Sequence, residues 1–314
     1  MLTVIGETLI DEVVRPGQSA LPQVGGSPMN VAVGLARLGH PVQFLGRFGR
    51  DAYGDMVAGH LRENDVLVPV APDSHPTSVA RALLDDAGAA SYEFSLTWEL
   101  PAVAPGPDGA PNFMLAATTL LHTGSIATML APGADQVFAA VVAAHPTATI
   151  SYDPNCRPSI ITDVGYAREQ AEKFVRLADV VKASDEDLAW LYPGVDPLEA
   201  ARTWLASGGG EGPAVVVVTR GGDGPWAVCA AGEAQCVVPP TKVADTVGAG
   251  DSFMAALLSA LVERELDGAQ RRAALRGISC KTLEELLRYA ARAAAITVSR
   301  AGANPPTRAE LLEG

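Results

Sequence analysis

Residues 245–251 read DTVGAGD and combine small residues with two carboxylates. Apolar residues recur at helical spacing from 254 to 261, which predicts a helix directly after this stretch. Residues 248–250 would then lie at the helix N-terminus, where free N–H groups and the helix dipole attract a phosphate. A carboxylate at Asp251 would repel a phosphate that merely binds, but beside a phosphoryl group in transfer it can take a proton from an attacking hydroxyl. The stretch therefore predicts phosphoryl transfer, and the alternative is a tight turn in which Asp251 only stabilises the helix dipole.

The composition is that of a large folded protein with an acidic surface. Of the 314 residues, 48% are hydrophobic and 19% are charged, and the net charge is −13. This length suits one large α/β domain or two small ones. The negative charge argues against nucleic acid and against an anionic membrane surface as partners. An anionic ligand would need a local positive pocket.

The cysteines and the N-terminus predict a cytoplasmic protein. Cys156, Cys229, Cys236 and Cys280 show neither C-x-x-C spacing nor a neighbouring histidine cluster, so we expect reduced thiols. The first residues lack the basic region and apolar run of a signal peptide. No apolar run is long enough to cross a membrane.

The elements that must position this chemistry alternate between strand and helix along most of the chain. Such alternation is typical of a mostly parallel sheet covered by helices. The helix that begins near residue 27 is expected to have Ser27 as its N-cap and Pro28 at its first position. The predicted strands are 2–5, 41–48, 118–122, 147–152, 180–183 and 214–219, the predicted helices are 27–38, 51–64, 135–144, 164–177, 185–191, 197–207 and 283–298, and a hairpin is predicted from 226–229 and 234–238.

A second, smaller sheet is predicted apart from this body. Residues 78–84 and 90–96 read as two strands joined by a hairpin turn at 85–88, and 8–24 could supply further strands. In the main sheet, ligands are expected beyond the carboxyl ends of the strands. The loops there that carry polar or glycine residues are 124–125, 153–157, 184–187 and 219–224.

Two stretches resemble the signatures of the ribokinase-like (PfkB) carbohydrate kinase family. Residues 245–251 resemble the second signature, and GGSPMNVA at 25–32 together with GRFGRDAYGD at 46–55 resembles the first. They occur in the expected order and near the expected ends, so the resemblance covers nearly the whole chain. It implies one kinase domain over 1–314, a three-layer α/β/α fold, and a small β-sheet lid formed by parts of 8–24 and 66–98. It also implies ATP-dependent phosphorylation of a sugar or nucleoside hydroxyl.

The resemblance also implies roles for individual residues. Arg157 resembles an arginine near the substrate or phosphates in fructokinase and ketodeoxygluconokinase relatives. Ser184 and Asp187 stand where many members have Asn-x-x-Glu, a motif tied to magnesium and phosphate, and Asp245 with the backbone of 299–304 resembles a monovalent-cation site. By motif, the base is Asp251, the anion hole is Gly248, Ala249 and Gly250, the nucleotide loop is Thr219, Gly221 and Gly224, and the sugar contacts are Asp11, Gly25, Gly26 and Asn30.

Several of these residues have a purely structural alternative. Asp11 could be a solvated strand residue, Arg157 a surface ion-pair partner, and Ser184 a helix N-cap. The glycines at 25–26 and 221–224 could serve turns alone. Tyr92, Phe94 and Trp98 could line the sugar pocket or pack within the lid, and the second is favoured.

The function expected from the residues and the resemblance together is that of a fructokinase-like sugar kinase. It would use ATP and Mg²⁺, with K⁺ as a further candidate ion, and phosphorylate a primary hydroxyl of a small sugar under a lid that excludes water. Pairing of lids could form a homodimer. The alternative substrates are 2-keto-3-deoxygluconate, ribose and a nucleoside, and the alternative class is an inactive sugar-binding regulator on the same fold. A Rossmann dehydrogenase and a P-loop kinase are excluded, because their glycine and Gly-Lys patterns are absent.

Overall fold

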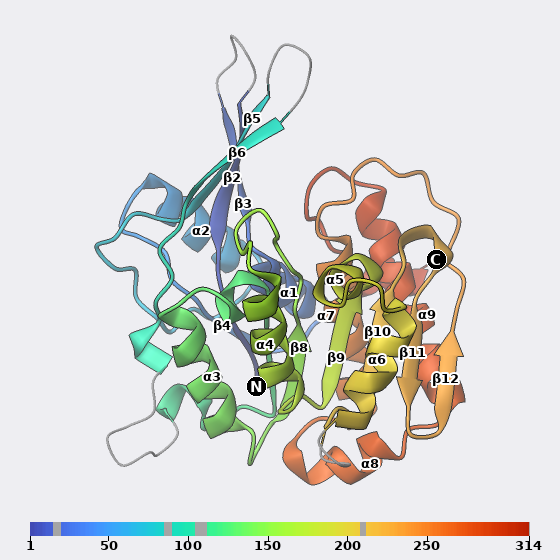
Figure 1. The fold of residues 1–314 in the computed structure, drawn as a ribbon. Helices are drawn as coiled ribbons and strands as arrows, with labels where there is room; N and C mark the ends of the chain where they lie inside the picture. Colours follow the sequence, from blue (N-terminus) through green and yellow to red (C-terminus); the bar gives the residue numbers. More distant parts are fainter. Residues whose placement is uncertain (15–19, 85–89, 104–111, 208–211, 314) are drawn as a thin grey trace.

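The computed structural model describes residues 1–14, 20–84, 90–103, 112–207 and 212–313. Within them the chain forms a large and a small sheet (Figure 1). The strands of the larger sheet are β1 (Leu2–Ile5), β4 (Val42–Leu45), β7 (Leu120–Gly124), β8 (Thr149–Asp153), β9 (Val180–Ser184), β10 (Val215–Thr219), β11 (Trp226–Cys229) and β12 (Gly232–Gln235), and those of the smaller sheet are β2 (Leu9–Val14), β3 (Leu21–Gly25), β5 (Val79–Leu84) and β6 (Ala90–Ser95).

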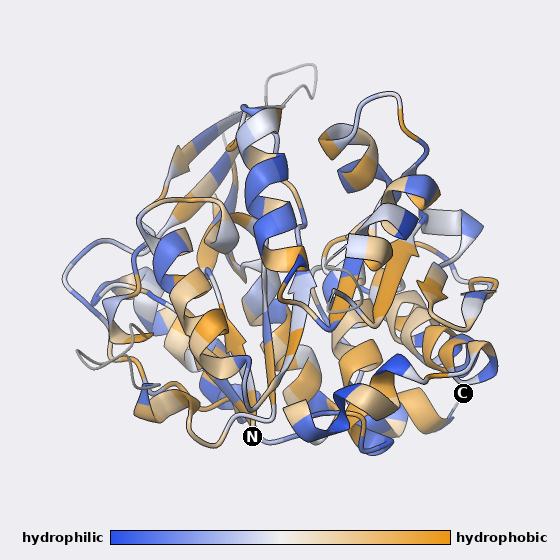
Figure 2. Cartoon of the chain, turned by 60° about the horizontal axis from the view of Figure 1, so that its bottom comes forward, coloured by the Kyte–Doolittle hydropathy of each residue, from blue (hydrophilic) through white to orange (hydrophobic). Residues whose placement is uncertain are grey.

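The larger sheet has the order β12-β11-β10-β9-β8-β7-β1-β4. All its neighbours are parallel except at one edge, where β11 pairs antiparallel with β10 and β12. Its central strands are short apolar runs such as VVVV in β10, buried on both faces as parallel strands require. In Figure 2 these strands are mainly orange, whereas several outer helices carry blue stretches.

Helices cover both faces of this sheet. Buried side chains of α1, α7 and α9 belong to one hydrophobic cluster, and those of α3, α4, α5 and α6 belong to the other, so the architecture has the predicted three layers. None of the described helices is both long and apolar enough to span a bilayer. The α-helices are α1 (Ser27–Arg37), α2 (Ala52–Glu63), α3 (Gly133–Ala144), α4 (Val164–Val175), α5 (Asp185–Leu191), α6 (Pro197–Ala206), α7 (Ala249–Glu263), α8 (Arg272–Arg276), α9 (Cys280–Val298) and α10 (Arg308–Glu313), and the 3-10 helices include η3 (Ser125–Thr128) and η5 (Gly221–Asp223).

The smaller sheet projects from the body, as Figure 1 shows. Its order is β3-β2-β5-β6, so 9–25 and 79–95 supply its strands, as predicted. Residues 66–78 add no strand to it in the described part of the chain; Leu67 instead bridges Gln43 at the edge of the larger sheet. Residues 15–19 and 85–89 of the predicted lid, including the predicted hairpin turn, lie outside the described residues.

Arg47 fixes the point where the chain enters the smaller sheet. It is 4% exposed and pairs through two nitrogens with Asp73, at 2.7 and 2.8 Å. Its guanidinium also donates to the backbone carbonyls of His75 and Pro76. The first signature, residues 25–32 and 46–55, therefore has two structural roles. Its first part forms the start of α1, and its second part, through Arg47, anchors the segment that leads into β5.

Two local predictions differ from the structure, and two short helices have no counterpart in the predictions. Ser27 is not an N-cap: Gly26 is the cap residue of α1, no side chain caps it, and the Ser27 hydroxyl points elsewhere. The helix after the glycine stretch was expected to have one apolar face, but α7 is buried on all sides from Asp251 to Leu261 because helices flank it on both sides. The short helices α8 and α10 were not predicted, since five or six residues give too little periodicity to read.

Candidate active site

The N-terminus of α7 contains two glycines with different structural roles. Gly248 is the N-cap residue with φ 74°, and a Cβ there would lie 2.7 Å from the Cβ of Ala303. Only glycine fits that turn. At Gly250, by contrast, a Cβ would meet no atom closer than the Nζ of Lys182 at 3.5 Å. That distance is an ordinary van der Waals contact, so local packing does not require glycine at 250, and the partly exposed backbone there is accessible to an approaching phosphate.

Asp251 is the third residue of α7 and is 8% exposed. Its Oδ1 accepts a hydrogen bond from Ser27 Oγ at 2.6 Å, and its Oδ2 accepts one from Asn30 Nδ2 at 2.8 Å. Both donors come from the first turn of α1, which packs against α7. The predicted sugar contact Asn30 therefore holds the carboxylate with its amide group. The role of Ser27 was missed, because its partner lies far away in the sequence.

Asp11 lies on β2 at the base of the smaller sheet, and Gly25 makes room for it. A Cβ at Gly25 would lie 2.1 Å from Asp11 Oδ2. Gly26 has φ 116° and approaches the Glu7 carbonyl so closely that a Cβ would lie 2.6 Å from its oxygen. Although Asp11 is solvent-accessible, surrounding protein raises the pKa of its carboxyl, and the charge of Arg157 opposes that rise. Gly26 thus serves a turn, whereas Gly25 seats a carboxylate.

Arg157 follows β8 in an exposed loop. Its Nη1 donates to the carbonyl and side-chain oxygens of Asn155, at 3.1 and 2.7 Å, and to the Cys156 carbonyl at 3.0 Å. No ion pair to Arg157 is present in the described part of the chain, so the surface ion-pair alternative has no support there. Its positive charge instead acts to lower the pKa of the Asp11 and Glu7 carboxyls.

Ser184 and Asp187 form a capping box at the start of α5. Asp187 Oδ2 accepts from the Ser184 N–H at 2.9 Å and from its hydroxyl at 2.6 Å, while Oδ1 accepts from the Cys156 N–H at 2.7 Å. The N-cap alternative for Ser184 is therefore realised. Asp187 also ties α5 to the loop that carries Arg157.

The predicted nucleotide loop follows β10. Thr219 Oγ1 donates to the Ala183 carbonyl at 3.5 Å. Gly221 has φ 49° with nothing within 4 Å of a Cβ, whereas a Cβ at Gly224 would lie 2.2 Å from the Cys236 carbonyl oxygen. Gly224 is needed by the turn itself, and Gly221 is open.

Asp245 connects the second-signature loop to the segment after α9. Its Oδ1 accepts from the Val247 N–H at 3.0 Å and its Oδ2 from the Gly302 N–H at 2.8 Å. These backbone hydrogen bonds lower the pKa of Asp245 and keep it ionised. An anionic carboxylate thus lies between the two loops from which the predicted cation site would be built.

Two buried charged residues, Lys182 and Glu7, lie outside the set of predicted site residues. Lys182 of β9 pairs with Asp153 of β8 at 2.8 Å, and their side chains are 4% and 3% exposed. A lysine inside an apolar strand was a signal that could have revealed this pair. Glu7, 5% exposed, accepts from the Ala127 N–H at 3.1 Å. Burial raises the pKa of Glu7 to about 7, although the Ser125 hydroxyl and Arg157 act to lower it.

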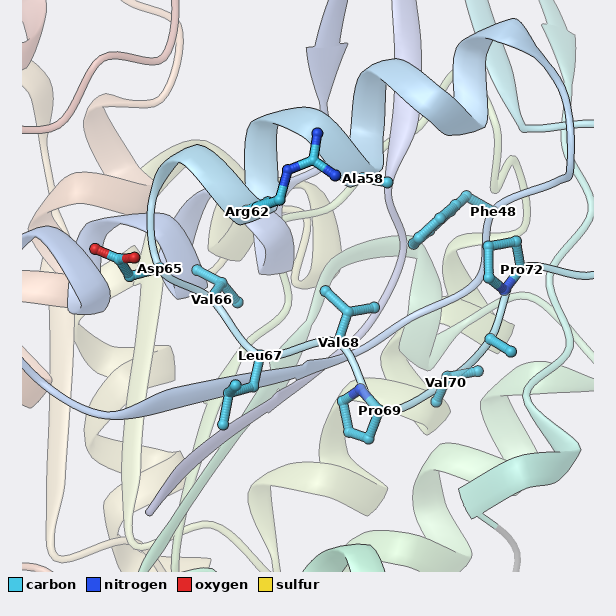
Figure 3. Close-up of a pocket in the computed structure, with 11 residues that line it drawn as sticks. Phe48, Ala58, Arg62, Asp65, Val66, Leu67, Val68, Pro69, Val70 and Pro72 are labelled. Atoms are coloured by element: carbon cyan, nitrogen blue, oxygen red, sulfur yellow. The ribbon is translucent and has the colours of Figure 1, made fainter.

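The structure gathers these residues beyond the carboxyl ends of the strands. Asp251, Ser27 and Asn30 are in direct contact, and Lys182 adjoins Gly250. A hollow of about 570 Å³ between α2 and the segment that follows it is a separate feature (Figure 3). It is lined by Phe48, Ala58, Arg62 and residues 65–72, none of which is a predicted site residue.

The chain is similar to known fructokinases over nearly its whole length. The fructokinase of Escherichia coli is 31% identical over 98% of this chain and 97% of its own length. A fructokinase from Xylella fastidiosa with bound ATP superposes with a TM-score of 0.85 at 26% identity, over 99% of this chain and 97% of that one. A fructokinase double mutant from Vibrio cholerae, in a form with fructose, ADP and potassium ion bound, gives a TM-score of 0.77 at 25% identity, over 99% and 97% of the two chains. Residues 1–310 match the pfkB family carbohydrate kinase pattern, and the chain therefore belongs to that family.

Proposed function

We propose that this chain is an ATP-dependent fructokinase that transfers the γ-phosphoryl group of ATP to a primary hydroxyl of fructose. The observation that carries this proposal is the buried Asp251 carboxylate, held by Ser27 and Asn30 in the first turn of α7. The names of the relatives support fructose as the acceptor and ATP as the donor.

In this reaction the sugar hydroxyl oxygen bonds to the γ-phosphorus, and Asp251 takes the proton from that hydroxyl. The bond from that phosphorus to the β–γ bridging oxygen breaks, and its electron pair leaves with ADP. The hydrogen bonds from Ser27 and Asn30 occupy one lone pair on each Asp251 oxygen and fix the carboxylate, which leaves a second lone pair for the proton. The N–H groups of Gly248 and Gly250 face the charge on the transferring group on this proposal, whereas the Ala249 N–H, predicted as part of the anion hole, donates to the Thr246 carbonyl at 3.2 Å.

The sugar is held, on this proposal, from the smaller sheet. Asp11 offers carboxylate oxygens to sugar hydroxyls, and Gly25 leaves the room in which that carboxylate lies. The charge of Arg157 acts on the Asp11 carboxyl, so Arg157 is proposed to serve the same substrate or the phosphates. Closure of the smaller sheet would exclude water and limit hydrolysis of ATP.

Mg²⁺ fits this site as an ion held mainly by ATP. In the described residues no group of three or more acidic, histidine or cysteine side chains is arranged to hold a metal. Mg²⁺ commonly keeps several waters and binds through substrate phosphates with one or two carboxylates. Asp187, already bonded to Ser184 and Cys156, would contact the water shell. When bound, the ion would neutralise the β- and γ-phosphates.

We also propose K⁺ at Asp245, a homodimer formed through the smaller sheets, and a cytoplasmic location. The ionised Asp245 between two loops supports the first. For the second, Val13, Leu21 and Tyr92 are 39%, 72% and 61% exposed, and their register puts them on one face of that sheet. The free thiols of the cysteines support the cytoplasmic location. Turnover in KCl against NaCl tests the ion, and sedimentation of Leu21→Asp against wild type tests the dimer.

A coupled ADP-release assay tests the proposed function. The purified chain, with ATP and Mg²⁺, is given fructose, 2-keto-3-deoxygluconate, ribose and adenosine in turn. We expect the highest kcat/KM with fructose, and a different best substrate would refute fructose but not the kinase. If no sugar or nucleoside yields ADP, while fructose still binds by calorimetry, the chain is a binding regulator instead.

A further inference from the structure

Lys182 lies directly beneath the N-terminus of α7. Its Nζ is 3.5 Å from where a Cβ on Gly250 would be, which places the ammonium within contact distance of the first turn of α7. Lys182 and Val180 face the α7 side of the larger sheet, and Val180 belongs to the hydrophobic cluster that includes α7. A strand position that would ordinarily carry an apolar residue therefore holds an ammonium group against the helix terminus.

The ammonium has hydrogen-bonding capacity to spare. A lysine has three N–H donors, and the ion pair with Asp153 uses one. No other hydrogen bond from Lys182 is present in the described part of the chain, although its side chain is only 4% exposed. Buried donors are normally satisfied, so two spare donors at the N-terminus of α7 point to a bound acceptor.

The charge on Lys182 is maintained by its surroundings. Burial would lower the pKa of Lys182, but Asp153, together with the more distant Asp187 and Asp251, raises it overall. The lysine is thus protonated at neutral pH and carries a fixed positive charge. Burial raises the pKa of Asp153 to about 6, which leaves it ionised at neutral pH.

The geometry points to Lys182 as a further catalytic residue: its ammonium donates a hydrogen bond to a γ-phosphoryl oxygen of ATP, and Asp153 positions it. This rests on the proposed function, because the ligand is the phosphoryl group in transfer. The bonding changes at phosphorus are those given above, and Lys182 keeps its proton throughout. Its positive charge balances the negative charge that gathers between Asp251 and the transferring group.

The first test is Lys182→Met, assayed by turnover and by calorimetric binding of ATP and ADP, each with Mg²⁺. We expect kcat to fall by about 10²–10³-fold, the loss typical for one donor to a developing charge. ATP affinity should fall about tenfold or more, while ADP affinity changes by less than about twofold, because ADP lacks the γ-phosphate. An equal loss of ATP and ADP affinity would overturn the assignment.

The matched control is Arg272→Met. Arg272 pairs with the buried Asp179 at the same distance, 2.8 Å, but Asp179 precedes β9 and so lies at the opposite end of the sheet. Both variants should lose thermal stability, yet only Lys182→Met should lose turnover below its melting temperature. If both keep kcat within about threefold of wild type, Lys182 is a structural ion-pair partner only.

A double variant covers the case in which Lys182→Met does not fold. Asp153→Asn with Lys182→Met replaces the pair by uncharged side chains of similar size, which buried sites often tolerate. It should show the same losses of kcat and ATP affinity, and a fully active double variant would overturn the proposal. Should the wild type phosphorylate no sugar, the proposed function fails, but the ATP-to-ADP affinity ratio still decides the role of Lys182.

Discussion

Gly248→Ala and Gly250→Ala should have opposite effects, although both lie in the first turn of α7. We expect Gly248→Ala mainly to lower the stability and Gly250→Ala mainly to lower the turnover. The two residues are two positions apart and the substitution is the same, so each variant is the control for the other. Gly248 has φ 74° and lies against Ala303, whereas Gly250 has an ordinary φ and only Lys182 near a Cβ.

The expected magnitudes follow from this geometry. Alanine in a left-handed conformation costs about 1–2 kcal/mol, and a Cβ 2.7 Å from Ala303 adds about 1–3 kcal/mol of overpacking. With the unfolding entropy expected for this length, 1 kcal/mol shifts Tm by roughly 1.5 °C, so Gly248→Ala should lower Tm by about 3–7 °C. Gly250→Ala should leave Tm unchanged or raise it slightly, because alanine favours the helix by at most about 1 kcal/mol.

Turnover should respond in the opposite order. A methyl group at 250 enters the space proposed for the transferring phosphoryl group, and we expect kcat/KM for ATP to fall about 10²–10³-fold. Gly248→Ala, assayed well below its Tm, should lose less. Calorimetric melting and the coupled ADP assay measure the two effects. A Gly250→Ala enzyme within about threefold of wild type would show that the phosphoryl group does not approach there, and an unshifted Tm for Gly248→Ala would contradict the cap geometry.

Three further predictions concern single carboxylates. Asp251→Asn should lower kcat by roughly 10²–10⁴-fold with ATP affinity retained, and turnover within about threefold of wild type would remove the base assignment. Asp11→Ala should lower kcat/KM for fructose by roughly 5–150-fold without changing the ATP affinity measured in the absence of sugar, and a loss of ATP binding instead would refute its sugar role. Because burial raises the pKa of Glu7 to about 7, the folded protein holds a proton that the unfolded chain has lost between about pH 4.5 and 7. Stability relative to Glu7→Gln should therefore fall by about 3 kcal/mol as pH rises through that window, then stay level; parallel pH curves in urea unfolding would contradict this.

The sequence predicts the fold well wherever a pattern is local. Periodicity and capping residues locate α2 and α5 almost to the residue, and the Asp51 side chain caps α2 by accepting from the Gly54 N–H. The strand order could not be predicted in the same way, because pairing such as β1 between β4 and β7 joins segments distant in the chain. Likewise, residues 66–78 look like part of the lid by position, but Leu67 pairs along the larger sheet.

Site residues could likewise be predicted where their role depends on neighbours in the sequence, but not where it depends on a distant partner. Gly248 and Asp251 could be recognised because the helix that presents them begins at the motif itself. At Ser27 the local pattern predicts an N-cap, because serine commonly has that role at the start of a helix. The Ser27 hydroxyl instead bonds Asp251, 224 positions later in the chain, and no local pattern carries that information.

The charge balance explains why a buried ion pair is useful at this position. A protein of net charge −13 repels a polyanion such as ATP at long range, although salt screens most of that repulsion beyond about 8–10 Å. Attraction must therefore come from groups within the site, where screening is weak. A buried ammonium alone would cost several kcal/mol and tend to lose its proton. The pairing of Lys182 with Asp153 at 2.8 Å keeps the ammonium charged before ATP arrives. Buried pairs of this kind add little to stability, so the benefit of the Lys182–Asp153 pair lies in holding a permanent cation at the N-terminus of α7.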